Sequence, residues 1–432
     1  MRTSFRRCWG PLAGAMALAL AVSACGGNTS TGGATAGGPA KLTWWHNASQ
    51  EPGKSFWQTV ANEYHAAHPN VTIDVVPIQN EQFTTKIPVA LQSSDPPSVY
   101  QQWGGGQLAD QVSAGKVMDI TDAVRPWIGS VGSAATNWQV KGRQYGVPYS
   151  LGLVGFWYDK DLFTQAGISA PPATWDEFLA DVQKLKAAGI APIALGGKDK
   201  WPDAFYWDYL AVRACSKGTL QQAAVDYKLT NACWTEAGTR VKQLLDANPF
   251  QNGFLATPAQ LGAGSAAGLL GNGKAAMELQ GHWDPGVMAS LTPDLKGLGS
   301  KLGWFPFPTL SDGKGLKGAM LGGGDGFSCS YKAPPQCVDF LKYVSSVDVQ
   351  KRWAALNVGL PVTRGAETGV QDPSLQSLIG IRGSASYVQL YLDIAFVTSV
   401  GQALDDAIAA QFAGTMTPDQ VIKAITDAAK NR

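Results

Sequence analysis

The chain has 432 residues, with 34 lysine and arginine residues against 33 aspartate and glutamate residues, which leaves a formal net charge of +1. Charged residues make up 16% of the sequence, below the roughly 25% that is usual for globular proteins. Nothing in this balance indicates a nucleic-acid partner. The length predicts two domains or one large two-lobed body.

The first 25 residues have the layout of an export signal that ends in a lipid attachment site. Basic residues open the chain, and an apolar stretch from about Pro11 to Val22 follows, too short to span a bilayer. The run Val22-Ser23-Ala24-Cys25 resembles a bacterial lipobox, in which the cysteine becomes a diacylated N-terminus. We therefore predict a signal peptide over residues 1–25 and lipidation of Cys25. An ordinary cleaved signal is the alternative.

Small and polar residues fill positions 26–40, which predicts a flexible linker before a body that starts near Lys41. The linker and the lipid together would hold the body outside the cytoplasm, tethered to the cell membrane. A tether is most useful where no periplasm confines the protein, which favours a bacterial envelope of the Gram-positive kind.

Within the body, short β-rich runs alternate with helical patterns, so we predict an α/β architecture. The predicted elements at its start are strands over 41–45, 71–76 and 98–101 and helices over 53–68, 83–91 and 109–114. Further along, Thr174 and Glu177 form a predicted capping box that opens a helix. Pro418, after Thr417, opens the last helix at its first position.

Four cysteines lie outside the leader: Cys215, Cys233, Cys329 and Cys337. An even number is typical of disulfides in an exported protein, and three connectivities are open. We prefer the local pairs Cys215–Cys233 and Cys329–Cys337, since each closes a short loop. The alternative interpretation of these cysteines is a zinc site. The chain has no C-x-x-C pair and its histidines lack metal-ligand spacing, so we expect no metal.

A series of motifs occurs in a characteristic order along the body. They are Leu42-Thr43-Trp44-Trp45-His46-Asn47, Tyr145-Gly146-Val147-Pro148-Tyr149, the run from Phe156 to Phe163, the run from Pro171 to Phe178, the run from Gly273 to Met277, Gly281-His282-Trp283 and Gly322-Gly323-Gly324. Behind a lipobox, this order resembles the extracellular sugar-type solute-binding proteins of ABC importers, the class that includes maltose-binding protein. The resemblance covers nearly all of residues 41–432. One departure is Pro97-Ser98, where many relatives carry Pro-Asp.

The resemblance implies a two-lobed periplasmic-binding-protein fold whose hinge is crossed three times, near Tyr149-Ser150, near 318–321 and near 361–364. Lobe 1 would comprise residues 41–149 and 322–362, and lobe 2 residues 150–321 and 363–432. A di- or oligosaccharide would bind in the cleft between the lobes and be delivered to membrane permease subunits driven by a cytoplasmic ATPase. The resemblance implies no cofactor and no catalysis, and we expect a monomer.

A sugar site stacks an aromatic ring on the apolar face of a pyranose and places polar side chains around its hydroxyl rim. This pairing recurs at predicted strand ends. The candidate ligand contacts are Trp45, Asn47, Ser49, Gln102, Trp103, Gln107, Tyr149, Trp201, Asp203, Tyr206, Trp207, Trp283, Asp325 and Arg364. Trp283 matches the family's stacking position.

For some of these candidates, the sequence is also consistent with a role other than ligand binding. Of Trp44 and Trp45, which lie on opposite strand faces, one is expected in the core. One of Trp201, Tyr206 and Trp207 is expected to stack on the ligand, and Arg364 has surface solvation as its alternative. The glycines at 104–106 would let a ligand approach the backbone.

Enzyme classes find little support in the sequence. The run from Gly268 to Lys274 starts like a phosphate loop, but Ala275 stands where Ser or Thr must hold magnesium. No Gly-x-Ser-x-Gly motif occurs, and no spacing singles out the carboxylate pair of a glycosidase. Among saccharides, we favour xylo-, cello- or malto-type oligomers. The alternatives are an amino-sugar oligomer, a polyol, or a sugar sensor or adhesin that shares the fold.

Overall fold

The structure is a computed structural model that describes residues 38–431. The predicted signal peptide, the predicted lipidation of Cys25 and most of the predicted linker lie outside the described residues. In the described part of the chain, every helix is too short or too polar to cross a membrane.

The larger sheet has six strands in the order β11-β10-β3-β1-β2, with β6 also pairing with β10. Its strands are β1 (Ala40–His46), β2 (Val71–Pro77), β3 (Val99–Gln102), β6 (Val147–Leu153), β10 (Ala319–Cys329) and β11 (Tyr387–Leu390). β1 is parallel to β2 and β3, whereas β10 is antiparallel to β3 and β6. The predicted β-α-β unit at the start of the body is confirmed, because α1 (Gly53–Ala67) connects β1 to β2.

Helices from two parts of the chain cover this sheet. They are α1, α2 (Asn80–Gln92), α3 (Gly105–Ser113), α4 (Thr121–Val124), α12 (Gln336–Val344) and α13 (Val347–Ala354), with the 3-10 helix η1 (Ile128–Trp138) and the β4–β5 hairpin (Gln139–Val140, Arg143–Gln144) beside them. The core between the sheet, α1 and α12 is aromatic. Trp44 is fully buried there, with its ring centroid 5.3 Å from that of Trp57 and 4.9 Å from that of Phe340.

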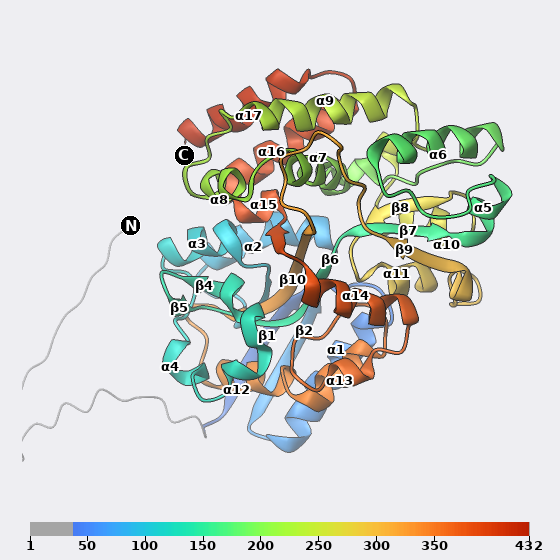
Figure 1. The fold of residues 1–432 in the computed structure, drawn as a ribbon. Coiled ribbons are helices and arrows are strands. Elements are labelled where there is room, and N and C mark those ends of the chain that lie inside the picture. Colours follow the sequence, from blue (N-terminus) through green and yellow to red (C-terminus); the bar gives the residue numbers. More distant parts are fainter. Residues whose placement is uncertain (1–37, 432) are drawn as a thin grey trace, which may run out of the picture. The chain divides into compact units, whose positions relative to one another are not determined.

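A second sheet has three strands in the order β8-β7-β9, and β7 is antiparallel to both neighbours. Its strands are β7 (Gly155–Asp159), β8 (Met277–Gln280) and β9 (Leu302–Phe305), with α5 (Lys160–Gln165), α6 (Trp175–Ala187), α10 (Ala266–Gly271) and α11 (Asp284–Ser290) around them (Figure 1). The predicted capping box is confirmed at the start of α6, where Thr174 and Glu177 hydrogen-bond reciprocally.

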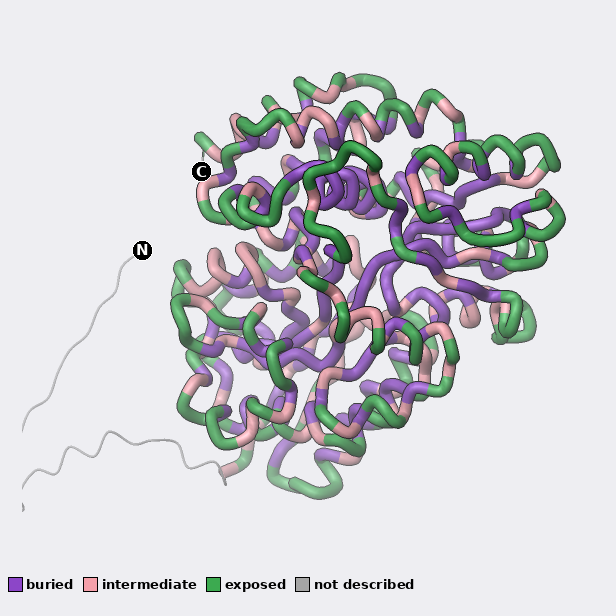
Figure 2. Tube along the Cα trace, in the orientation of Figure 1, coloured by how far each residue is buried: buried purple, intermediate pink, exposed green. Residues whose placement is uncertain are grey.

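A group of helices packs on the second sheet and on β10. It contains α7 (Trp201–Ala214), α8 (Lys217–Asp226), α9 (Ala232–Asp246), α15 (Leu392–Ala395), α16 (Thr398–Phe412) and α17 (Pro418–Lys430), and α14 (Pro373–Ser384) lies apart beside β6 and β9. The short 3-10 helices are η2 (Gly197–Asp199), η3 (Phe254–Ala256), η4 (Gly299–Lys301) and η5 (Glu367–Gly369). Figure 2 shows α7 buried along nearly its whole length, which makes it the central helix of this group.

The two sheets are joined closely by the chain. β6 in the larger sheet is followed by β7 in the smaller one with only Val154 between them. β10 begins at Ala319, within the predicted second crossing, and Ser150 pairs with Pro361 at the predicted third one. β11 joins the larger sheet beside β10, although the sequence-based division places its residues in lobe 2. The exact lobe boundaries stay a prediction.

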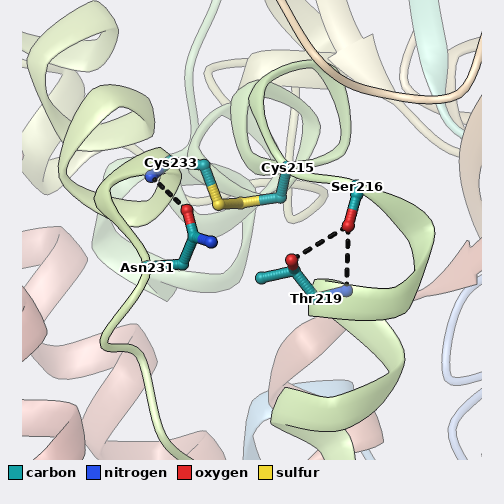
Figure 3. The surroundings of a disulfide bond; sticks show 5 residues. All are labelled: Cys215, Ser216, Thr219, Asn231 and Cys233. Atoms are coloured by element: carbon teal, nitrogen blue, oxygen red, sulfur yellow. Dashed lines mark hydrogen bonds between the residues drawn. A yellow bond between two sulfur atoms is a disulfide. The ribbon is translucent and has the colours of Figure 1, made fainter.

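Both predicted disulfides are confirmed. Cys215 and Cys233, with Cα atoms 5.1 Å apart, join the end of α7 to the start of α9 (Figure 3). Next to this bond, Asn231 caps α9 by accepting a hydrogen bond from the backbone N–H of Cys233. Cys329 and Cys337 join the end of β10 to α12. Disulfide formation also removes the cysteines that a zinc site would need.

Candidate functional site

Two partly buried tryptophans from different elements lie near each other. Trp201 begins α7, and Trp283 lies in the loop between β8 and α11; their ring centroids are 6.4 Å apart and their planes are tilted by 59°. The indole N–H of Trp201 donates a hydrogen bond of 3.2 Å to Oε1 of Glu81 on α2. Trp201 lies on α7, which packs on the smaller sheet, and Glu81 lies on α2, which follows strand β2 of the larger sheet. The hydrogen bond between them therefore connects the two parts of the molecule.

A third tryptophan, Trp103, is held by a carboxylate. It follows β3, and its indole N–H donates a hydrogen bond of 3.0 Å to Oδ1 of Asp325 on β10. The same oxygen accepts a 2.6 Å hydrogen bond from Nε2 of Gln101, whose Oε1 accepts one of 3.3 Å from the Tyr149 hydroxyl. This chain of bonds fixes both the carboxylate and the plane of the Trp103 ring.

Asp325 is partly buried, and its position affects its ionisation. Burial raises the pKa of Asp325 to about 6, and the hydrogen bonds from Trp103 and Gln101 act in the opposite direction because they stabilise the ionised form. The carboxylate is therefore mostly ionised at neutral pH and becomes protonated in mild acid.

His282 connects the Asp325 region to Trp283. Asp325 on β10 pairs with Ser150 on β6, and the Ser150 hydroxyl is hydrogen-bonded at 3.0 Å to Nε2 of His282, the residue before Trp283. Burial lowers the pKa of His282 to about 3, so this imidazole is neutral. A Cβ atom at Gly152 would lie 2.2 Å from the imidazole, which explains the glycine there. Trp103, Trp201, Trp283, Glu81 and Asp325 are called the candidate site below.

The first predicted loop lies next to the candidate site. Trp45 is partly buried and packs, like Trp103, against the hydrophobic cluster around Phe83. The prediction that one of Trp44 and Trp45 is in the core is confirmed, since Trp44 is fully buried. Asn47 donates a 3.1 Å hydrogen bond to Asn80 at the start of α2, and Ser49 is partly buried in the same loop.

Several predicted contacts lie in the core instead. Tyr206 and Trp207 are fully buried; Tyr206 packs against Phe250, and Trp207 stacks on Trp234 with ring centroids 5.6 Å apart. The prediction that one of three aromatics on this segment faces a ligand therefore narrows to Trp201.

Asp203 and Tyr149 are also core residues. Asp203 is fully buried and neither of its carboxyl oxygens has a hydrogen-bond partner within residues 38–431. Burial, and next the charge of Asp199, raise the pKa of Asp203 well above its usual value. Tyr149 stacks on Phe327 with ring centroids 4.7 Å apart, and only its hydroxyl reaches toward the candidate site, through Gln101.

The remaining predicted contacts are spread out. Gln102 is buried and engaged at both ends, since it donates to Gln111 and accepts from the backbone N–H of Gly104. Gln107 is partly buried on α3, and Arg364 is exposed, with its backbone N–H donating to Ser130. The structure does not bring Gln107 or Arg364 into contact with the candidate site.

The glycines at 104–106 have another use than the one expected. A Cβ atom at Gly105 would lie 2.6 Å from the carbonyl oxygen of Ile394, and one at Gly106 would lie 2.4 Å from that of Phe396. A Cβ at Gly104 would meet the carbonyl of Asn137. Protein backbone fills the space next to these glycines, so the expectation that a ligand approaches the backbone there is wrong.

Three residues near the site were missed by sequence reasoning: Glu81, Gln101 and Tyr391. Gln101 lies beside two residues that were chosen, and the alternation of strand faces offered a signal for it. Tyr391 directly follows the short strand β11. Its position after a strand is the same signal that led to the other candidate contacts. Glu81 carries no comparable signal, because an acidic residue in the first turn of a helix usually serves the helix dipole.

The polar groups of the candidate site are mainly acceptors for hydroxyl or amide donors. In the described part of the chain, no group of three or more histidine, cysteine, aspartate or glutamate side chains is arranged to hold a metal ion. Flat indole faces beside fixed carboxylates match the two surfaces of a saccharide ring. The arrangement suits binding of a sugar ring.

Comparisons with known proteins agree with a binding role. The model of the bacterial extracellular solute-binding protein family matches residues 47–351. A relative from Pyrococcus horikoshii, described as an uncharacterized ABC transporter extracellular-binding protein, is 23% identical over 91% of this chain and 88% of the relative. Another from the same archaeon is 31% identical, but the match covers only 34% of its length.

The chain is also similar to a sugar-binding protein and to a solved structure. The multiple sugar-binding protein of Streptococcus mutans is 24% identical over 55% of each chain. A solved structure from work on xylan utilization by the thermophilic bacterium Caldanaerobius polysaccharolyticus has a TM-score of 0.80 and 25% identity, and covers 90% of this chain and 99% of that one. The predicted two-lobed α/β fold is thereby confirmed.

The family match spans more than half of the sequence, and it confirms the prediction of an extracytoplasmic solute receptor that is not an enzyme. This chain belongs to the bacterial extracellular solute-binding protein family.

Proposed function

We propose that the protein is the substrate-binding lipoprotein of an ABC importer and that it captures a di- or oligosaccharide at the candidate site. The observation that carries the proposal is the neighbouring pair Trp201 and Trp283, together with a third partly buried tryptophan, Trp103, with the indole N–H groups of Trp103 and Trp201 bonded to carboxylates. Three stacking surfaces exceed what one sugar ring needs. A xylo-oligosaccharide is our first choice, because a neighbour in fold comes from work on xylan utilization.

The ligand would lie in a cleft between the two predicted lobes. Glu81 and Trp103 follow strands of the larger sheet, whereas Trp201 and Trp283 belong to the smaller sheet and its helices. A saccharide that contacts both sets favours the closed arrangement, because its binding free energy is larger there. The closed form would then dock on the permease subunits, which a cytoplasmic ATPase drives, with the protein acting as a monomer.

Saccharide binding is tested by calorimetric titration of residues 36–432, because the described residues in this range form one compact unit. The panel is xylotriose, cellotriose, maltotriose, chitotriose and raffinose, with sorbitol and glycerol 3-phosphate as non-saccharide controls. We expect micromolar or tighter binding of at least one oligosaccharide, without shortened products in the recovered ligand. Binding of none of them, or release of shorter sugars, would overturn the proposal.

The lipid anchor rests on the sequence, since Cys25 lies outside the described residues. Tethering would keep the receptor close to its permease where no periplasm confines it. In a Gram-positive host, the full-length chain is expected to label with an alkyne fatty acid and to sediment with membranes. A Cys25→Ser chain should lose the label and appear in the medium; membrane retention of that variant would contradict lipidation at this residue.

A further inference from the structure

Tyr391 is a buried aromatic side chain whose hydroxyl is unused. It lies between β11 and α15 and is 7% exposed. Its ring centroid is 5.1 Å from that of Phe205, one helical turn after Trp201 on α7. Within residues 38–431, the Tyr391 hydroxyl has no hydrogen-bond partner. A buried hydroxyl without a partner costs free energy, so it calls for an explanation.

The position of the ring places Tyr391 beside Asp325. A Cβ atom at Gly323 would lie 2.4 Å from the Tyr391 ring, so the ring rests directly on that glycine. Gly323 and Asp325 are two residues apart on β10 and therefore share one face of the strand. The electrostatics agree: burial, and next the charge of Asp325, raise the pKa of Tyr391 well above its usual value.

Asp325 has one oxygen engaged and one available. Both hydrogen bonds that the Asp325 carboxylate accepts, one from Gln101 and one from Trp103, go to Oδ1. No hydrogen bond within residues 38–431 uses Oδ2, and the residue is partly exposed. Gln101 is itself held by the Tyr149 hydroxyl, so the carboxylate is oriented before any ligand arrives.

We propose that the Tyr391 hydroxyl and Oδ2 of Asp325 form a paired recognition point for two neighbouring hydroxyl groups of a saccharide ring. The carboxylate oxygen accepts from one ligand hydroxyl, and the tyrosine hydroxyl donates to or accepts from the next. Gln101 acts as a positioning residue, because it holds the carboxylate without being available to the ligand. This inference rests on the proposed saccharide function and specifies a vicinal diol as the recognised group.

The pair also sets what the site rejects. The charge of Asp325 faces the ligand with no lysine or arginine bonded to it, so a sugar carboxylate or phosphate in the same place would be repelled. A sugar that lacks one of the two hydroxyls would leave a buried polar group unpaired, which is the strongest form of discrimination that a polar site offers.

The test uses Tyr391→Phe, which removes only the hydroxyl oxygen, and calorimetric titration with the saccharide of the panel that the unchanged protein binds most tightly, which we expect to be xylotriose. We expect the dissociation constant to rise roughly tenfold, the effect of one buried hydrogen bond to a ligand. The matched control is Tyr343→Phe on α12, whose hydroxyl donates to Glu63 outside the candidate site; its affinity should equal that of the unchanged protein. Equal affinity of Tyr391→Phe and the unchanged protein would overturn the inference.

A double-mutant cycle provides the second readout. Asp325→Asn and Tyr391→Phe should each weaken binding, and the double variant should be weaker by clearly less than the product of the two factors, because both groups hold one diol. Fully multiplicative effects would contradict a paired site. If the unchanged protein binds no saccharide of the panel, the proposed function fails; if it binds one of them and the variants bind that saccharide with the same affinity, only this inference fails. Thermal melting of each variant shows whether it is folded.

Discussion

Trp201 and Trp207 lie on the same helix, α7, yet they have different surroundings. Trp207 is fully buried, stacks on Trp234, and has an indole N–H without a hydrogen-bond partner in the described part of the chain. Trp201 is partly buried, and its N–H donates to Glu81 across to α2. The difference teaches that two tryptophans on one helix can serve different purposes, and that partial exposure together with a carboxylate partner sets Trp201 apart from Trp207.

The same contrast separates Trp103 from two other core tryptophans, whereas the fully buried Trp138 and Trp157 donate to backbone carbonyl groups. Trp44 and Trp57 are core residues with unpartnered N–H groups among the described residues, and Trp103 at the candidate site donates to Asp325. Core tryptophans contribute mainly apolar surface to stability. Two of the three site tryptophans, Trp103 and Trp201, are held by carboxylates, and all three keep part of the side chain exposed.

The largest expected effect is on stability and comes from the core member of the pair. Trp207→Ala removes a fully buried ring from between α7 and α9 and should lower the free energy of unfolding by about 3–5 kcal/mol. Urea unfolding followed by circular dichroism measures it. Trp201→Ala is the matched comparison and should lower the free energy of unfolding by clearly less. An equal loss for both variants would contradict the distinction between a core and a site tryptophan on α7.

The next effect is on affinity and comes from Trp283. Trp283→Ala removes a stacking surface and should weaken binding of the preferred oligosaccharide roughly tenfold to a hundredfold, the effect of about 1.5–3 kcal/mol of aromatic burial. The melting temperature should change little, because the side chain is partly exposed. Retained tight binding in calorimetry would show that the stacking residue is misplaced.

The pH dependence of binding should report on Asp325. The ionised carboxylate is the better acceptor for sugar hydroxyls, and its pKa is raised to about 6. Affinity should therefore fall as the pH is lowered, by about tenfold between about pH 7 and about pH 5. Asp325→Asn cannot titrate, and its weaker affinity should be constant over this range. The same pH dependence in both proteins would assign the effect to another group.

The smallest effect isolates the hydrogen bond of Trp201. Trp201→Phe keeps an aromatic face but loses the N–H that reaches Glu81, and we expect affinity to fall only by roughly three- to fivefold, about 1 kcal/mol. Glu81→Gln, which still offers an acceptor oxygen, should cost less than that. A larger loss for Glu81→Gln than for Trp201→Phe would show that the charge of Glu81 acts on the ligand directly.

Much of the fold could be predicted from the sequence. The first β-α-β unit, the cap of α6 and both disulfides have local signals: alternation, a Thr/Glu pair three residues apart, and short loops between cysteines. β11 has no such signal, because its pairing with β10 joins segments far apart in the chain.

The candidate site was predictable only in part. Trp103, Trp201, Trp283 and Asp325 belong to motifs, but burial decided against Tyr206 and Trp207, and helix periodicity alone could not show that α7 is covered on all sides. The glycines at 104–106 have the same appearance in sequence whether a ligand or a helix backbone approaches them. Only the tertiary contact with Ile394 and Phe396 separates these cases.

The most direct test of the account is a crystal structure of the protein with the oligosaccharide that binds best in the calorimetric panel. The account predicts sugar rings stacked on Trp283 and on at least one of Trp103 and Trp201, with ring hydroxyls within hydrogen-bond distance of Asp325. A saccharide bound elsewhere on the molecule, or held without contact to any of these tryptophans, would contradict it.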